Sequence, residues 1–285
     1  MENIIDEVIR RLQSELEGTA IGRQETLKNN GQKRIGICIH HGDGCAAPVV
    51  YIDHLVKKGW TEADIAAYVV DTYYKSHWYS TDLADKVLKD YGSNKDFLNL
   101  RLVNYQKNKT MLDETPHRLF LDLAVIVVFD IPEMSGVRGV VNVHDSLLKA
   151  WKQSFGTVYR QALQNFHKEK SIILNMREVL HQCGNFPGTQ GSLPMYILSN
   201  PGFTFGSVRM LDGEAIRKFA SQLDADLVVL PSSVHETILL PMTERVDIKE
   251  FSRMVEEVNA TEVEPEEVLS DHAYIYRRDK GWSYA

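Results

Sequence analysis

The chain has 285 residues, of which 44% are hydrophobic and 25% are charged. That much apolar surface can offset the entropy of ordering, so the composition excludes disorder throughout and predicts one large domain or two smaller lobes. The formal net charge is −7. A general nucleic-acid binder needs a positive surface to displace the counterions of the phosphates, so no nucleic-acid partner is expected.

Features of the sequence also bear on its location. The N-terminal residues MENIIDEVIRRLQ contain acids before any base and no long apolar run, which does not fit a signal peptide. The most apolar stretch, residues 119–129, is shorter than the roughly 20 residues of a membrane-spanning helix and contains Asp122. Because Cys38, Cys45 and Cys183 cannot all pair with one another, we expect reduced thiols in a soluble, cytoplasmic protein without membrane contact.

The first half of the sequence predicts helices and strands in mixed order. Residues 2–17 form an amphipathic helix, because Ile5, Val8, Ile9 and Leu12 recur at helical spacing and need a surface on which to pack. The further expected elements are a polar connection over 22–31, a hairpin of strands 34–39 and 48–52, a helix from Thr61 with a capping box to Asp64, a helix over 82–91, and strands over 97–104, 118–131 and 137–143.

The second half predicts more strands. The expected elements are a helix over 155–168, a weak helix over 172–183, a loop over 184–194, strands over 195–200, 205–210, 226–230, 237–240 and 273–277, and helices capped by Asp212 and Asp247. Strands follow strands more often than they alternate singly with helices, so the predicted fold class is α+β, with mostly antiparallel mixed sheets and flanking helices. A change of rhythm near Trp151 predicts two α+β lobes, residues 1–152 and 153–285.

The segment CIHHGDGC concentrates metal-capable side chains, namely Cys38, His40, His41, Asp43 and Cys45. A closed zinc site needs four ligands, usually from two separated pairs, and no second pair of this kind is present in the sequence. On a strand, Cys38 and His40 would point to one face and His41 to the other. The preferred interpretation is a hairpin turn with a buried Cys38, and neither a metal nor another cofactor is expected.

The segment LPSSVHETILLP, residues 230–241, places a polar cluster between two apolar strands. Ser232, Ser233, His235 and Glu236 are residue types that act as nucleophile, base and orienting acid in enzymes. Adjacent residues on an extended chain point apart, however, and a tight turn that satisfies backbone groups is the alternative. These four residues are the candidate binding site, and no catalytic residue is assigned.

Two further features concern acidic side chains. Asp122 lies within an apolar strand, and a buried carboxylate needs a partner, for which Arg118 and His117 are the candidates. The segment from Glu244 to Asp271 contains ten acidic and three basic residues and therefore carries the whole net charge. We interpret it as a solvated helix face followed by an acidic loop, and a docking site for a basic partner is the alternative.

Four segments together resemble a known family: KNNGQKRIGICI, VNYQKNKTMLDETPHRLFLDLAVIVVF, LPSSVHETILLP and VNATEVEPEEVLSDHAYIYRR. Their order and spacing are similar to a bacterial domain-of-unknown-function family found mainly in anaerobic Gram-positive bacteria, with a more distant likeness to the YtpQ-like family. The resemblance covers nearly the whole chain and implies a cytoplasmic unit of mixed α/β content. It brings no activity, cofactor or catalytic residue. Its most recognisable motif, LPSSxHE, contains Ser232, Ser233, His235 and Glu236.

The sequence contains no phosphate-binding P-loop, dinucleotide-binding turn, zinc-protease helix or nucleophile elbow. The leading expectation is therefore a non-catalytic binding or protein-interaction protein. The N-terminal helix and the acidic segment are the surfaces it could offer to a protein partner. The alternative is a small hydrolase, with or without a metal ion, that uses the polar cluster of LPSSVHE. An open cleft in which titratable groups converge would favour the hydrolase, and a closed turn would favour binding.

Overall fold

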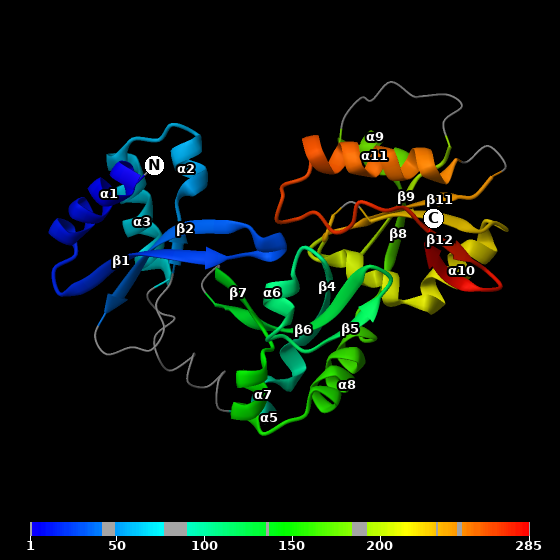
Figure 1. Cartoon of the computed structure of the whole chain (residues 1–285), viewed down its shortest axis with the longest axis horizontal. Coiled ribbons are helices and arrows are strands. Elements are labelled where there is room, and N and C mark those ends of the chain that lie inside the picture. The colour runs from blue at the N-terminus through cyan, green and yellow to red at the C-terminus, as the bar shows by residue number, and fades with distance from the viewer. Residues whose placement is uncertain are drawn as a thin grey trace.

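The computed structural model describes residues 2–41, 49–76, 90–134, 137–183, 193–231, 233–243 and 247–284. Within these ranges the strands form three sheets, and every pairing between strands is antiparallel (Figure 1). The chain therefore has the α+β fold that the order of its elements predicts. None of the helices described is long and apolar enough to cross a membrane.

The N-terminal part is a three-stranded sheet, sheet A, with helices packed against it (Figure 1). Its elements are α1 (Glu2–Glu15), β1 (Thr19–Leu27), the 3-10 helix η1 (Asn29–Gly31), β2 (Lys33–His41), β3 (Val49–Tyr51), α2 (Asp53–Lys57) and α3 (Glu62–Ser76). The predicted apolar face of α1 is confirmed, since Ile5, Val8 and Leu12 are buried in one cluster with Ile37 and Ile39 of β2. This helix therefore packs on the body of the protein.

One expectation for this part is wrong. The polar connection predicted over 22–31 belongs mostly to β1, which pairs with β2 along its whole length. The side chains of β1 are exposed or half-buried, so the strand lacks the apolar alternation by which a strand is recognised. The hairpin of β2 with β3 and the capping box of Thr61 with Asp64 are confirmed. The helix predicted over 82–91 lies almost entirely outside the described residues.

The middle part is a four-stranded sheet, sheet B, in which β6 pairs with the three other strands. Its elements are α5 (Tyr91–Asn94), the 3-10 helix η2 (Lys95–Phe97), β4 (Leu98–Asn104), α6 (Lys109–Leu112), β5 (His117–Phe120), β6 (Leu123–Met134), β7 (Val137–Asn142), α7 (Asp145–Trp151) and α8 (Phe155–Phe166). The single strand predicted over 118–131 is in fact two. The chain reverses at Leu121 and Asp122. Leu121 adopts a left-handed φ of 57°, a conformation that leucine rarely adopts, so its residue type does not predict the turn.

The C-terminal part is a six-stranded sheet, sheet C, of order β13-β12-β10-β11-β9-β8. Its elements are β8 (Ile172–Asn175), α9 (Met176–Cys183), β9 (Tyr196–Ser199), the 3-10 helix η3 (Gly206–Leu211), α10 (Gly213–Gln222), β10 (Leu227–Leu230), β11 (Thr237–Pro241), α11 (Ile248–Thr261), β12 (Tyr274–Arg277) and β13 (Gly281–Tyr284). Leu227 and Val229 face one cluster, and Val228 and Leu230 face another that includes Val255 of α11. Both faces of the sheet are therefore covered.

The strand predicted over 205–210 is wrong, because these residues form η3. Phe205 has a left-handed φ of 51°, and Gly206 lies tightly against the strand ends, so the segment cannot continue as a strand. The first residues of the weak helix predicted over 172–183 form the strand β8, and the rest form α9. The strand β13 was not predicted. The helix caps at Asp212 and Asp247 are confirmed, since each carboxylate accepts a backbone N–H from the first turn of its helix.

Sheets B and C share the largest hydrophobic cluster, whereas sheet A has a cluster of its own. The shared cluster joins Phe129 of β6 and Trp151 of α7 to Val229 and Tyr274 of sheet C. Residues on both sides of position 152 thus contribute to one core. The predicted division into 1–152 and 153–285 stays a prediction.

Gly206 is a position at which the fold has no room for a side chain. A Cβ atom there would clash with the hydroxyl of Ser199 and lie 2.7 Å from the backbone nitrogen of Asn200 and from the carbonyl oxygen of His235. We expect Gly206→Ala to lower the free energy of unfolding by about 1–3 kcal/mol, the usual cost of overpacking. Urea denaturation monitored by circular dichroism measures the change.

Gly213→Ala is the matched control, because nothing lies within 4 Å of a Cβ atom at that position in α10. Alanine also favours a helix over glycine, so this variant should be as stable as the parent or slightly more stable. Equal stability of the two alanine variants would contradict the tight packing of η3 against sheet C.

Candidate functional site

The segment between α11 and β12, residues 262–273, makes contacts on the sides of all three sheets. We call it the junction loop. Its sequence, EVEPEEVLSDHA, contains proline and several acids, which disfavour a strand or a long helix. Val268, Leu269 and Ser270 are nevertheless buried. A buried loop must find partners for its backbone groups, and here the partners come from sheet A, sheet B and sheet C in turn.

On the side of sheet C, the junction loop pairs with the LPSSVHE segment. The N–H of Val234 donates to the carbonyl of Glu267 at 2.8 Å, and the N–H of Ser270 donates to the carbonyl of Pro231 at 3.1 Å. Ser233 and Val268 form an isolated antiparallel bridge between these bonds. Two segments that carried the sequence resemblance, LPSSVHE and LSDHAYIYRR, therefore lie side by side.

His235 is held at both nitrogens of its ring. Its Nδ1 atom accepts the backbone N–H of Phe205 at 3.3 Å, and its Nε2 atom lies 3.3 Å from a carboxylate oxygen of Glu267. Since Nδ1 accepts a bond, the ring proton sits on Nε2 and points to Glu267. The ring also packs on Phe205, at 5.2 Å between centroids, and the guanidinium of Arg101 lies 3.4 Å from the Phe205 centroid.

The other predicted site residues are placed less directly. Ser233 is buried, and its hydroxyl oxygen accepts the backbone N–H of His235 at 2.9 Å. Glu236 is half-buried and forms no ion pair with any residue that the structure describes. Ser232 lies outside the described residues. The serine and histidine side chains are thus linked through the backbone of a turn, and the assignment of these residues to a binding site stays a prediction.

On the side of sheet B, Asp122 binds the junction loop. The hydroxyl of Ser270 donates to its carboxylate at 2.8 Å, and the hydroxyl of Tyr274 donates to the other oxygen. Burial, followed by the charge of Asp122, raises the pKa of Tyr274 well above its ordinary value, so this hydroxyl keeps its proton. The prediction that Arg118 or His117 pairs with Asp122 is wrong. The Arg118 guanidinium lies over the ring of Tyr159, and His117 contacts a backbone carbonyl.

Two more residues bind the same loop, one at the end of β4 and one shortly after it. The amide of Asn104 donates to the carbonyl of Leu269 at 3.0 Å, and the ammonium of Lys107 pairs with Asp271 at 2.9 Å. Burial alone would raise the pKa of Asp271. The bonds from Asn259 and Lys107 outweigh it, so that pKa lies below its ordinary value and the carboxylate remains charged at neutral pH.

On the side of sheet A, the turn at η1 reaches the junction loop. The side-chain amide of Asn30 donates to the carbonyls of Pro265 and Val268 at 2.9 and 2.7 Å. Asn30 has a left-handed φ of 58°, a conformation that asparagine adopts more readily than most residues. The guanidinium of Arg34 makes a two-pronged bond to Glu266, with distances of 2.6 and 3.2 Å.

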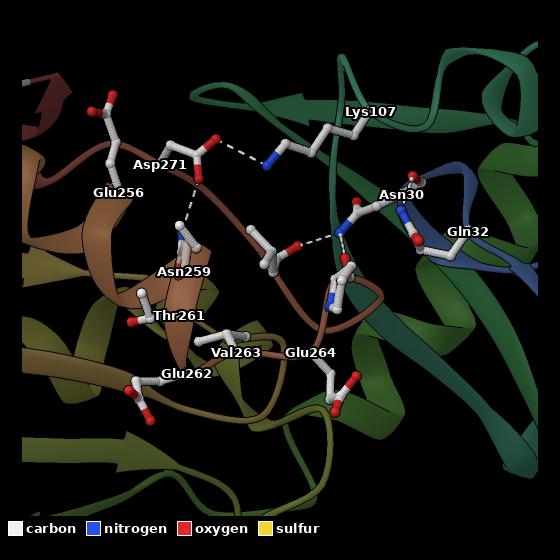
Figure 2. A pocket seen from close by; sticks show the side chains of 13 residues that line it. Asn30, Gln32, Lys107, Glu256, Asn259, Thr261, Glu262, Val263, Glu264 and Asp271 are labelled. Carbon is white, nitrogen blue, oxygen red and sulfur yellow. Dashed lines mark hydrogen bonds and ion pairs between the residues drawn. The ribbon is translucent and has the colours of Figure 1, made fainter. Parts of the chain in front are cut away.

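A cavity of about 670 Å³ opens beside the junction loop (Figure 2). Its walls come from the η1 turn, from Lys107, and from the C-terminal end of α11 with the loop itself. This volume is in the range of small-molecule sites. The lining contains four acidic side chains, Glu256, Glu262, Glu264 and Asp271, and one basic side chain, Lys107.

Asn259 lines this cavity and is only 8% exposed. Its side-chain nitrogen donates to the carbonyl of Ser270 at 2.9 Å. The same nitrogen donates to the carboxylate of Asp271, also at 2.9 Å (Figure 2). These two acceptors fix the orientation of the amide. Its oxygen, in contrast, has no donor among the described residues.

The cavity and the predicted site are neighbours but do not coincide. Val268 bridges Ser233 and also lines the cavity, whereas neither His235 nor Glu236 does. Sequence reasoning missed Asn30, which the Asn-Asn-Gly turn could have indicated as a left-handed position. It interpreted the acidic segment mainly as solvated surface, although that segment supplies one wall of the cavity.

The metal-capable segment shows a contact between two of its members. The thiol of Cys38 lies 3.3 Å from Nε2 of His40, on one face of β2 as the strand period predicted, and burial raises the pKa of the thiol. Asp43 and Cys45 lie outside the described residues, as does the side chain of His41. Among the residues that are described, no three metal-binding side chains come together.

Three antiparallel sheets that meet at one buried polar loop define an α+β protein with a junction cavity. The chain belongs to DUF5688, a family of unknown function, which matches residues 1–278. The full-length resemblance found in the sequence is therefore confirmed, while the YtpQ-like similarity and the motif stay predictions. No curated protein matches the chain, and no solved structure does either.

The contacts of His235 predict how its replacement affects stability. His235→Ala removes the acceptor of the Phe205 N–H and the contact with Glu267, so the free energy of unfolding should fall by about 1–2 kcal/mol. His235→Asn can keep an acceptor near Nδ1 and should lose about half as much. Urea denaturation measures both variants.

His272→Ala is the control for this pair, because His272 is an exposed histidine of the neighbouring junction loop. Its effect should stay within about 0.5 kcal/mol, as for most surface substitutions. If His235→Ala were as stable as His272→Ala, the ring contacts would contribute nothing, and the ring would be free to serve a ligand.

Proposed function

We propose that this protein is a non-catalytic binding protein whose ligand occupies the cavity beside the junction loop. The observation that carries this proposal is the origin of the cavity walls, which come from three segments far apart in the sequence. A molecule in the cavity would therefore contact the η1 turn, the Lys107 segment and α11 at the same time. Binding sites commonly lie where separate parts of a fold meet.

The contacts of the LPSSVHE segment support binding over the hydrolase alternative. A hydrolase of this type needs a nucleophile within hydrogen-bond reach of a free imidazole nitrogen. Each ring nitrogen of His235 already has a partner, and the hydroxyl of Ser233 bonds to the backbone. The segment therefore resembles a turn that holds the junction loop in place, which would position the cavity wall without taking part in chemistry.

The proposal is tested by filling the cavity. Ala260 lines it and is exposed on α11, so Ala260→Trp adds bulk to the cavity without disturbing the core. A thermal-shift screen of small molecules against the parent should yield a ligand, and Ala260→Trp should weaken its binding at least about tenfold, which corresponds to about 1.4 kcal/mol.

The matched control is Ala67→Trp, which places the same ring on an exposed position of α3 that does not line the cavity. This variant should bind the ligand as the parent does. A ligand that binds Ala260→Trp and the parent equally well would place the site elsewhere. Hydrolysis of a model ester that His235→Ala abolishes would favour the hydrolase instead.

A further inference from the structure

The outer edge of sheet A is a second surface, separate from the cavity beside the junction loop. β1 is the outer strand of this sheet, and none of its residues, all of which the structure describes, lines the cavity. We propose that β1 pairs antiparallel with β1 of a second copy of this chain, so that the two copies of sheet A form one continuous sheet across a two-fold axis. This inference goes beyond the proposed function and does not depend on a ligand in the cavity.

The length and regularity of β1 favour such pairing. With nine residues, it is the longest of the described strands that have only one partner strand. Its register with β2 continues without a shift from Thr19 to Leu27, and its sequence TAIGRQETL contains no proline. Proteins commonly protect a sheet edge by making its strand short, by a bulge or by a proline. β1 has none of these three features.

The backbone bonds show which residues of β1 face the open edge. The N–H of Lys28 donates to Gln32 at 2.7 Å and continues the register of β1 with β2. The carbonyl of Ile35, which lies opposite Glu25, accepts the N–H of Ile52 at 3.2 Å and so points away from β1. Because bonded and non-bonded pairs alternate in an antiparallel ladder, the even-numbered residues of β1 bond to β2. Its odd-numbered residues direct their N–H and C=O groups to the open edge.

One of these edge carbonyls is satisfied by a side chain. The side-chain amide of Gln24 donates to the carbonyl of Glu25 at 2.9 Å, and both residues are exposed. A strand of another molecule would supply a backbone N–H at the same place. An exposed side chain exchanges readily with such a donor, so this bond does not prevent pairing.

The side chains of β1 favour one register. If Gln24 lies opposite the partner's Gln24 on the two-fold axis, then Arg23 lies opposite the partner's Glu25. In the same register Ile21 lies opposite the partner's Leu27. Opposite charges and apolar pairs directly across two strands are stabilising, and by symmetry each pair occurs twice. Leu27, which is 50% exposed, would gain an apolar neighbour.

The neighbouring registers lack this complementarity. A shift that keeps the outward backbone groups opposite one another moves the partner strand by two residues. One such shift places Arg23 opposite the partner's Arg23, and the other places Glu25 opposite the partner's Glu25. Like charges directly opposite one another are destabilising. The charge of Glu25 is maintained at neutral pH, because the hydrogen bond and the charge of Lys33 lower its pKa.

Sedimentation equilibrium of the full chain over a range of concentrations tests the inference, and we expect a reversible dimer. Arg23→Glu turns two attractive pairs into two repulsive pairs and should weaken the dimer about tenfold or more. Glu25→Arg should have the same effect. The matched control is Arg217→Glu, which changes the net charge equally on an exposed position of α10. Its dimer should stay within about twofold of the parent, because that charge is screened from the edge.

A mixture of the two edge variants gives the sharpest result. In a mixed dimer, the carboxylates of the Arg23→Glu chain face the guanidinium groups of the Glu25→Arg chain. The mixed dimer should therefore form with about the affinity of the parent, although neither variant pairs well with itself. Recovery in the mixture would also show that both variants are folded.

Three results would overturn the inference. If the parent chain is monomeric at every concentration, the edge is left to a different protein or to solvent. If Arg23→Glu leaves the dimer unchanged, the two copies meet at another surface. If both variants weaken the dimer and their mixture does not recover it, the effect of charge is diffuse and the proposed register is wrong.

Discussion

The fold depends on satisfying the backbone of one buried loop. The junction loop cannot form regular structure, yet Val268, Leu269 and Ser270 are removed from solvent. Each of its buried carbonyls needs a donor, because an unpaired polar group in the interior is costly. Asn30, Asn104 and Val234 supply such donors from sheet A, sheet B and sheet C respectively. The polar requirement of one segment thereby fixes the meeting point of three sheets.

This arrangement explains why the cavity lies where it does. Sheets B and C share an apolar core, but sheet A has a separate one and meets the junction loop through asparagine and arginine side chains. Such bonds are directional and do not fill space as apolar packing does, so gaps can remain between the two surfaces that they join. The cavity opens at this meeting point, between the η1 turn and α11.

Local signals in the sequence were sufficient for much of the fold. The apolar strands β4, β10 and β11, the amphipathic face of α1, and the caps at Asp212 and Asp247 depend on residues close together in the chain. Where the signal was not local, prediction failed. β1 is too polar to be recognised without its partner β2, and the reversal at Leu121 occurs without a glycine or proline.

The site was less accessible to sequence reasoning for the same reason. Asn30 and Val268 are separated by 238 positions, and their bond cannot be inferred from composition or period. The four segments that carry the resemblance do contain Asn30, Asp122, Val234 and Asn259, all of which bind the junction loop. The resemblance therefore indicated the right segments, while only the fold shows that they meet and enclose a cavity.

Hydrogen exchange at the junction loop tests the central claim most directly. If the loop ties the sheets together, the amides of Val234 and Ser270, which donate to Glu267 and Pro231, should exchange as slowly as those of β10. The amides of Asp279 and Lys280, in an exposed turn of the same sheet, provide the fast reference. Exchange of Val234 and Ser270 at the rate of that turn would contradict the account.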